Sequence, residues 1–187
     1  MIEAFLVSLS TVSIAEMGDR TQLLSLVLAA KFRKPWQITL GVLLATIANH
    51  AAAGLIGVWF GRVFTPTVVN LIVGLSLVAM AVWTLKPDTL GSESVSGKSA
   101  FLATLAAFFI AEIGDKTQIA TIALAAAYRS LFAVVAGTTL GMMAANIPVI
   151  FLGSGFASRL PLRQIHVAAA TLFFVLGFVF LFRAFWH

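Results

Sequence analysis

The sequence predicts an all-α integral membrane protein, with six transmembrane helices arranged as two inverted three-helix repeats. The composition, six separate apolar segments and one long internal repeat support this fold class. Of the 187 residues, 60% are hydrophobic and only 10% are charged, and the mean hydropathy is +1.04. A soluble domain carries about 25% charged residues. The balance is typical of a membrane-embedded chain and leaves no room for a soluble domain.

The formal net charge of +5 comes mainly from basic residues in short loops between the apolar segments. Such residues are typical topology signals. No basic patch with interleaved aromatic residues is present, so we expect no nucleic acid as a partner. The apolar composition predicts the lipid bilayer as the partner instead. Cysteine is absent, which excludes disulfides and thiolate metal ligands. The N-terminal Met1-Ile2-Glu3 lacks the basic region of a signal peptide, so we expect it to begin the first span.

Each of six apolar segments is close to the length of about 20 residues that a spanning helix needs. The first contains a charged octet near its middle, and the fourth contains a similar one. A stretch rich in glycine, serine and charged residues, 86–98, separates the third segment from the fourth. We expect it to be a cytoplasmic linker between repeat 1 (1–85) and repeat 2 (99–187). The six segments are 4–30, 36–60, 68–85, 100–127, 131–156 and 165–182.

The octet Ala15-Glu16-Met17-Gly18-Asp19-Arg20-Thr21-Gln22 returns as Ala111-Glu112-Ile113-Gly114-Asp115-Lys116-Thr117-Gln118. An offset of 96 residues (112 − 16) aligns the two halves without a gap, and seven of nine positions from 14 to 22 are identical. Three spans per repeat is an odd number, so the second repeat must enter the membrane from the opposite side. Inverted repeats of this kind are typical of secondary transporters whose site lies at the membrane midplane.

The loop charges predict the orientation, because cytoplasmic loops carry an excess of lysine and arginine. We therefore expect the side with seven basic residues to be cytoplasmic and both termini to lie outside. In a bacterium this predicts a multi-pass inner-membrane protein with periplasmic termini. The seven are Lys31, Arg33, Lys34, Lys86, Lys98, Arg159 and Arg163, and the opposite side has Arg62, Arg129 and Arg183.

On a continuous helix, Glu16 would share a face with Asp19 and neighbour Arg20. Gly18 would allow another backbone to approach, or the helix to open. Inverted symmetry would bring both octets together, with four carboxylates around one cavity. Their charge of −4, offset by two basic residues, leaves −2, which matches one divalent cation. The expected metal ligands are Glu16, Asp19, Glu112, Asp115, Gln22 and Gln118. The expected supporting or proton-coupling residues are Arg20, Lys116, Thr21, Thr117, Asn49, His50 and Asn146.

This ligand set is hard and rich in oxygen, which suits Ca²⁺, Mn²⁺ or Mg²⁺. Mg²⁺ loses water reluctantly, and a nitrogen from His50 would favour Mn²⁺. A charged side chain at the bilayer centre costs free energy. When no cation is bound, we therefore expect carboxylates of the site to take up protons. Cation and protons would then compete for the same oxygens, which is the minimum requirement for an exchanger.

Other interpretations of these residues stay open. The charged pairs could be salt bridges that lock two helices together, and His50 could be a hydrogen-bonding residue between helices. Paired acidic rings also occur in channels. An intramembrane hydrolase is disfavoured, because the three histidines (His50, His166 and His187) form no H-E-x-x-H motif.

The doubled E-x-G-D-[KR]-T-Q motif, at Glu16–Gln22 and Glu112–Gln118, resembles the signature of the Gdt-one-type cation/proton exchangers, which include bacterial MneA-type manganese exporters. The resemblance covers essentially the whole chain. It implies export of Mn²⁺, or of Ca²⁺ and Mn²⁺, in exchange for protons, with no enzyme activity and no cofactor. It also implies metal binding by Glu16, Asp19, Glu112 and Asp115. A Ca²⁺/H⁺ antiporter that also carries Mn²⁺, and a divalent-cation channel, remain the alternatives.

Overall fold

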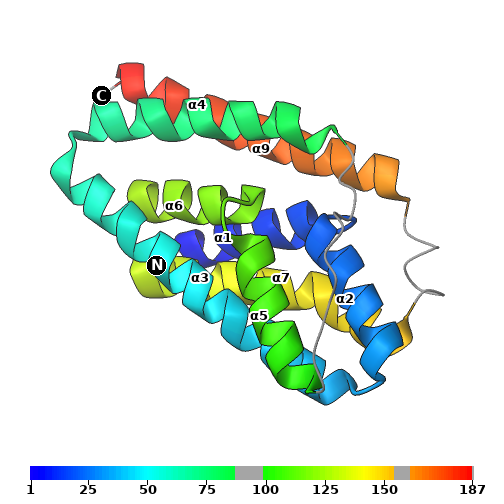
Figure 1. The fold of residues 1–187 in the computed structure, drawn as a ribbon. Helices are drawn as coiled ribbons and strands as arrows, with labels where there is room; N and C mark the ends of the chain where they lie inside the picture. The colour runs from blue at the N-terminus through cyan, green and yellow to red at the C-terminus, as the bar shows by residue number, and fades with distance from the viewer. Residues whose placement is uncertain (87–98, 154–160, 187) are drawn as a thin grey trace.

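The computed structural model describes residues 1–86, 99–153 and 161–186, and these ranges fold almost entirely into helices (Figure 1). Most of the predicted linker 86–98, with Lys98, and the basic residue Arg159 lie outside the described residues. The helices are α1 (Ile2–Glu16), α2 (Arg20–Phe32), α3 (Pro35–Val63), α4 (Pro66–Thr84), α5 (Ala100–Glu112), α6 (Lys116–Tyr128), α7 (Leu131–Leu152) and α9 (Leu162–Trp186).

Four of the described helices, α3, α4, α7 and α9, are long and apolar enough to cross a membrane. Their outer surfaces carry many exposed hydrophobic side chains, unlike the surface of a soluble protein. On α9, for example, Phe174, Phe178 and Phe182 follow one another at every fourth position, and each is more than half exposed. A stripe of exposed phenylalanines at helical spacing is suited to lipid contact. The chain is therefore an all-α integral membrane protein.

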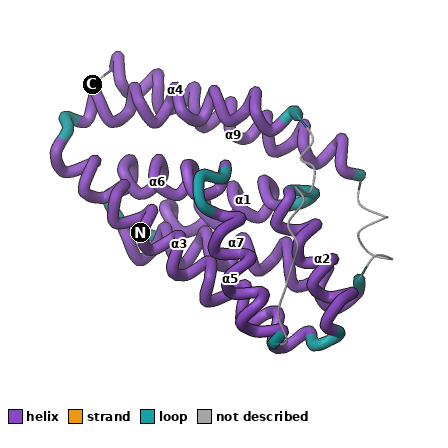
Figure 2. The backbone as a smooth tube through the Cα atoms, in the orientation of Figure 1, coloured by secondary structure: helices purple, strands orange, loops and turns teal. Residues whose placement is uncertain are grey.

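The two segments that contain the octets are interrupted, which is one of the outcomes that the glycine in each octet allowed. Residues 4–30 form α1 and α2, and residues 100–127 form α5 and α6, with a short non-helical turn inside each octet. Figure 2 shows one of these turns between α5 and α6. The interpretation of Glu16, Asp19 and Arg20 as neighbours on one continuous helix was therefore wrong. The reason lies in the glycine, which has φ +82° at Gly18 and +75° at Gly114, a conformation that no α-helix contains.

Local sequence explains several helix starts. Proline occupies the first turn of α3 and of α4, where its missing N–H costs no hydrogen bond. Thr65 caps α4 by accepting from the Val68 N–H, and Ser99 caps α5 by accepting from the Leu102 N–H. These caps satisfy backbone donors that a helix start leaves without partners. Helix α7 ends at Leu152, earlier than the predicted end at residue 156.

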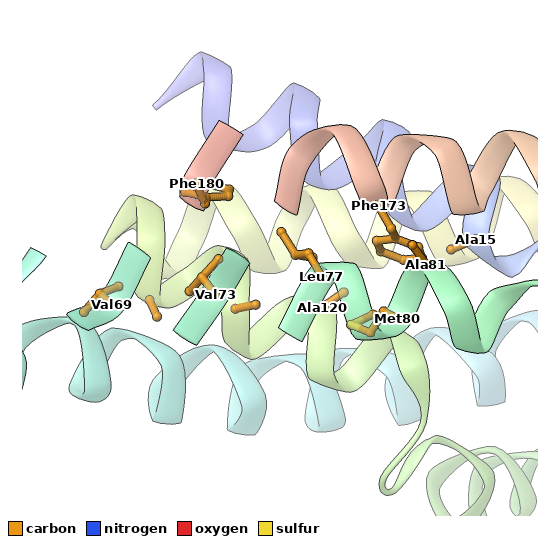
Figure 3. Packing of buried hydrophobic residues seen from close by; sticks show 11 residues of the cluster. Ala15, Val69, Val73, Leu77, Met80, Ala81, Ala120, Phe173 and Phe180 are labelled. Carbon is orange, nitrogen blue, oxygen red and sulfur yellow. The ribbon is translucent and has the colours of Figure 1, made fainter. Parts of the chain in front are cut away.

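Helices α4 and α9 run side by side along one edge of the molecule (Figure 1). Their backbones approach closely at Gly74, because a Cβ there would lie 2.9 Å from the Gly177 carbonyl oxygen. Between this pair and the rest of the bundle lies a cluster of eleven buried hydrophobic residues from α1, α4, α6 and α9 (Figure 3). Phe173 and Leu77 are among its fully buried members. Small residues with close backbones are typical of helix packing in membranes.

Glycines also bring α3 against α5 and α7 against α1. A Cβ on Gly41 would lie 3.0 Å from the Phe101 carbonyl oxygen, and one on Gly137 would lie 2.5 Å from the Phe5 carbonyl oxygen. Both glycines differ by 96 residues, and so do both phenylalanines. The same contact is therefore made twice, each time between the two halves of the chain. These contacts hold α1 and α5, and thus both octets, inside the bundle.

Candidate metal centre

The first octet forms a break between two half-helices. Helix α1 ends at Glu16, and α2 begins after Asp19, with Gly18 between them in a left-handed conformation. The Gly18 N–H donates to Oε1 of Gln22 at 2.8 Å. Because the helix is broken here, the buried Gly18 N–H has no partner within the helix, and the Gln22 side chain supplies it.

The second octet has the same construction. Helix α5 ends at Glu112, α6 begins after Asp115, and Gly114 has a positive φ. The Gly114 N–H donates to Oε1 of Gln118, again at 2.8 Å. Both predicted glutamine ligands therefore direct their carbonyl oxygen to the glycine N–H. Their part in metal binding stays a prediction, while their part in bracing the break is observed.

Asp19 and Asp115 occupy the N-cap positions of α2 and α6. Neither side chain caps its own helix, so each carboxylate is turned towards other partners. The N-terminus of a helix has a partial positive charge and favours an anion beside it. The break therefore places each aspartate where the backbone itself lowers the cost of a buried negative charge.

Three of the four predicted acidic ligands come together. Glu16, Asp19 and Asp115 each offer an oxygen, and these oxygens lie within 4.8 Å of one another. All three residues are buried, with exposed fractions of 0%, 1% and 3%. At an effective dielectric constant of 20, each pair of negative charges at this distance repels by about 3 kcal/mol. The group therefore needs a cation, a proton or a basic side chain to be stable.

The two basic residues of the octets cross between the repeats. Nζ of Lys116 forms an ion pair with Oδ1 of Asp19, and both side chains are buried. Nε of Arg20 lies 3.6 Å from Oδ1 of Asp115, and its guanidinium also donates to the Ala111 carbonyl oxygen. Each octet thus neutralises the aspartate of the other. This exchange replaces the predicted contact between Arg20 and Glu16.

Glu112 is buried but is absent from the group of three carboxylates. Its Oε1 accepts from Thr46 at 2.7 Å and its Oε2 accepts from Asn49 at 2.8 Å. Helix α3 therefore holds both oxygens of this carboxylate. Only three of the four carboxylates predicted to line one cavity meet, and Asn49, one of the predicted supporting residues, donates to the fourth.

The hydroxyl groups of Thr21 and Thr117 both contact carboxylates of the site. Thr21 donates to Oε2 of Glu16 at 2.5 Å, and the Thr117 hydroxyl lies 3.4 Å from Oδ2 of Asp115. The other oxygen of Glu16, Oε1, is buried and accepts no hydrogen bond from the described residues.

Asn146 and His50, which the 96-residue offset relates, have different surroundings. Asn146 accepts from Ser25 at 2.6 Å and donates to the Met142 carbonyl oxygen at 3.0 Å. It therefore joins α7 to α2, one turn beyond the break. His50 is fully buried, and neither ring nitrogen has a hydrogen-bond partner among the described residues.

Sequence reasoning missed Thr46 and Ser25. Each lies one turn from a predicted residue: Thr46 is three residues before Asn49, and Ser25 is three after Gln22. Helical spacing could have found both, because residues three apart share a helix face. Neither position has a polar counterpart with the same role in the other repeat, so the doubled motif gave no signal for them.

The chain was compared with known families and proteins. The family model described as "Divalent cation/proton antiporter GDT1" matches residues 4–92 and 100–187. The chain belongs to the GDT1 family. This membership confirms the resemblance drawn from the doubled motif, and the family is described as one of divalent cation/proton antiporters.

The relatives span most of the chain. A Vibrio cholerae protein named "Putative manganese exporter" is 46% identical over 173 residues, which is 91% of this chain and 86% of the relative. A GDT1-like protein of Synechocystis is 27% identical over 96% of this chain and 97% of its own length. GDT1-like protein 3 of Oryza sativa is 31% identical over 95% of this chain and 72% of its own. No solved structure matches the chain.

Proposed function

We propose that this GDT1-family protein exports Mn²⁺ from the cytoplasm in exchange for protons, through a carboxylate site shared by the two octets. The observation that carries the proposal is the meeting of Glu16, Asp19 and Asp115, with oxygens within 4.8 Å of one another inside a membrane protein. Intramembrane acidic residues are costly and mark ion pathways by default. The family description and the name of the Vibrio cholerae relative support the same function.

We propose that each broken pair, α1–α2 and α5–α6, crosses the membrane once, which gives six crossings. Half-helices of 13 to 15 residues extend only about 20 Å, so neither half spans a core of about 30 Å alone. The start of α1 lies near the end of α6, where the Tyr128 hydroxyl is 3.3 Å from Glu3. Ala100, at the start of α5, clusters with Leu28 near the end of α2. The two broken pairs thus run in opposite directions, as inverted repeats require.

The proposed orientation places the N-terminus outside, in the periplasm of a bacterial inner membrane. Arg129 and Arg183 line one small cavity at the end where α6 and α9 finish. Tyr128 there contacts both Glu3 and Phe180, so the first and last helices share this end. This end has few basic residues among those described, whereas Lys31, in the last turn of α2, is followed by Arg33 and Lys34 just before α3. The positive-inside rule assigns that richer end to the cytoplasm.

In the proposed cycle, Mn²⁺ enters between Glu16, Asp19 and Asp115 and takes the place of protons. Lys116 then has to release Asp19, because the ammonium and the metal compete for the same carboxylate. All four acidic residues with Arg20 and Lys116 sum to −2, which one divalent cation neutralises. When protons replace the metal, the ion pair of Lys116 with Asp19 forms again and the site stays near neutrality. The hard oxygen ligands suit Mn²⁺, with Glu112, Gln22 and Gln118 as the remaining proposed ligands.

The second candidate is a Ca²⁺/H⁺ antiporter that carries Mn²⁺ as a second substrate. The oxygen ligands of the site suit Ca²⁺ as well as Mn²⁺, because Ca²⁺ binds through six to eight oxygens. Competition between the two ions in one proteoliposome preparation separates the candidates. A divalent-cation channel is the third candidate. Accumulation of the ion against its own gradient in proteoliposomes would exclude it, because a channel conducts only down the gradient.

The site assignment is tested with Glu16→Gln and Asp115→Asn in cells that need this protein to tolerate manganese. Each change removes one negative charge and keeps the size of the side chain. We expect both variants to insert in the membrane at wild-type levels and to lose manganese tolerance. Glu3→Gln, at the exposed start of α1, is the matched control and should keep tolerance. Full tolerance in both site variants would contradict the assignment.

A further inference from the structure

The end of the molecule at which α6 and α9 finish has a small cavity with two arginines in its wall. Arg129 is the C-cap residue of α6, and Arg183 lies in the last turn of α9. With Pro66 and Asn70, from the start of α4, they line a cavity of about 350 Å³. Figure 1 shows that the start of α4 lies beside the end of α9. Helices α4, α6 and α9 thus bring two positive charges and an asparagine to the same space.

The positive charge of this cavity is not balanced by the described part of the chain. Neither Arg129 nor Arg183 forms an ion pair with a described acidic residue. No acidic residue is among the described residues that line the cavity. Glu3, at the same end, accepts from the Tyr128 hydroxyl at 3.3 Å. Because like charges repel each other, an anion beside both arginines would be stabilised.

Local structure fixes where both arginines lie. The ζ carbon of Arg183 lies 5.7 Å from the centroid of the Phe180 ring, and the buried Phe180 packs edge-on against Tyr128. A cation–π contact of this kind positions a guanidinium group and leaves its N–H donors available. Arg129 has φ +50°, a left-handed conformation in which glycine is the usual residue at a helix end. The chain therefore keeps a charged side chain where glycine would fit the backbone better.

Helix dipoles do not explain the shared cavity. A positive charge near a helix C-terminus is favoured in any case, which accounts for the sign of each charge. The effect is confined to the last turn of each helix, so it does not require the two arginines to meet. Arg62, in the last turn of α3, has the same relation to its own helix but does not line the cavity. It is therefore the matched control for a charge effect alone.

The cavity lies at the depth of lipid headgroups. Trp59, near the end of α3, and Trp186, at the end of α9, are both exposed at this end of the molecule. Exposed tryptophans are typical of the membrane interface. Further towards the membrane centre, α4 exposes Leu75 and α9 exposes Phe178, which offer an apolar surface to acyl chains. A ligand with a phosphate group and an apolar tail therefore fits the chemistry of this region.

We propose that Arg129, Arg183 and Asn70 form a binding site for the headgroup of an anionic phospholipid. The arginines bind the phosphodiester oxygens, and the Asn70 amide donates to the same headgroup. The positive charge of a choline headgroup is repelled by the arginines, so the site prefers phosphatidylglycerol to phosphatidylcholine. In the proposed orientation the lipid comes from the periplasmic leaflet. The site is separate from the carboxylate group and does not depend on the transported ion.

Native mass spectrometry of the full chain in detergent measures the affinity for the first bound lipid. The wild type is titrated with phosphatidylglycerol and with phosphatidylcholine, beside Arg129→Gln, Arg183→Gln and Arg62→Gln. The two cavity variants should each bind phosphatidylglycerol about fivefold more weakly, which is the effect of one basic residue near an anionic lipid surface. Arg62→Gln should bind it like the wild type. If Arg183→Gln fails to fold without its contact to Phe180, Asn70→Leu tests the same site, with a loss of about fivefold for one hydrogen bond.

The source of the phosphate is tested with glycerol phosphate, which has the phosphate group without acyl chains. We expect it to compete with phosphatidylglycerol far more weakly than a second phosphatidylglycerol does. Equally strong competition would overturn a lipid ligand. Wild-type affinity in both cavity variants, an equal loss in all three arginine variants, or binding of phosphatidylcholine as tight as that of phosphatidylglycerol would overturn the site.

Discussion

The clearest test of the site energetics compares the two basic residues that cross between the octets. Lys116→Met removes the charge that balances Asp19 and keeps a long, apolar side chain of similar length. Both members of this ion pair are buried, with side chains 4% and 1% exposed. Breaking a buried ion pair by removing one partner costs about 3–5 kcal/mol, because the remaining charge stays without compensation. We therefore expect a strongly destabilised protein when no metal is present.

Manganese should reverse this loss, because a divalent cation supplies the positive charge that the variant lacks. A ligand present at 100 times its dissociation constant stabilises the bound state by about 2.7 kcal/mol. The gain on adding Mn²⁺ should be larger in Lys116→Met than in the wild type, since the ammonium no longer competes for Asp19. The measurement is thermal unfolding of the purified protein in detergent, with and without Mn²⁺.

Arg20→Met is the matched comparison within the same site. Its side chain is 34% exposed and its Nε lies 3.6 Å from Asp115. Solvent screens such a pair, and exposed pairs contribute about 0–1 kcal/mol. We expect a small loss of stability and a small effect of Mn²⁺ on it. Equal losses in both variants, or no recovery of Lys116→Met with Mn²⁺, would refute the reasoning.

Two further predictions use matched positions. Gly18→Ala should cost more stability than Gly114→Ala: both have a positive φ, which costs about 1–2 kcal/mol for an alanine. At Gly18 the new Cβ would also meet side-chain atoms at 2.7 Å and 3.0 Å, whereas at Gly114 it would meet no atom of the described residues within 4 Å. Equal melting temperatures would contradict this. Thr46→Val should leave Oε1 of the buried Glu112 carboxylate without its donor, which costs about 1–3 kcal/mol, while Asn49 still donates to Oε2, and should slow transport. Thr39→Val, whose hydroxyl has no partner among the described residues, should change the free energy of unfolding by less than about 0.5 kcal/mol, and a larger loss there than at Thr46 would count against the assigned bond.

Much of the fold could be predicted because hydrophobic length and loop signals are local. The segments 36–60 and 68–85 lie close to α3 and α4, and Pro35 and Pro66 fix where these helices begin. The breaks inside the octets could not be predicted with the same certainty. Glycine permits a positive φ but does not require it, so only the packed structure decides whether the helix opens at Gly18.

The site was predictable in its membership and less so in its pairing. Doubling of the motif marked Glu16, Asp19 and Asp115, which do meet. The pairing of Lys116 with Asp19 was missed, because spacing arguments hold only within one continuous helix and this contact joins two repeats. The separate environment of Glu112 was missed too. It depends on Thr46 and Asn49 of α3, for which the second repeat has Met142 and Ala145 at the equivalent positions.

The central claim is that one buried carboxylate site takes either a divalent cation or protons. Simultaneous recording of Mn²⁺ and proton flux in proteoliposomes tests it most directly, with Mn²⁺ equal on both sides and the lumen acidic. The account predicts net Mn²⁺ uptake against its own rising gradient, a matching rise of lumenal pH, and loss of both fluxes in Glu16→Gln. Mn²⁺ movement that ignores the pH gradient, or that persists in Glu16→Gln, would contradict it.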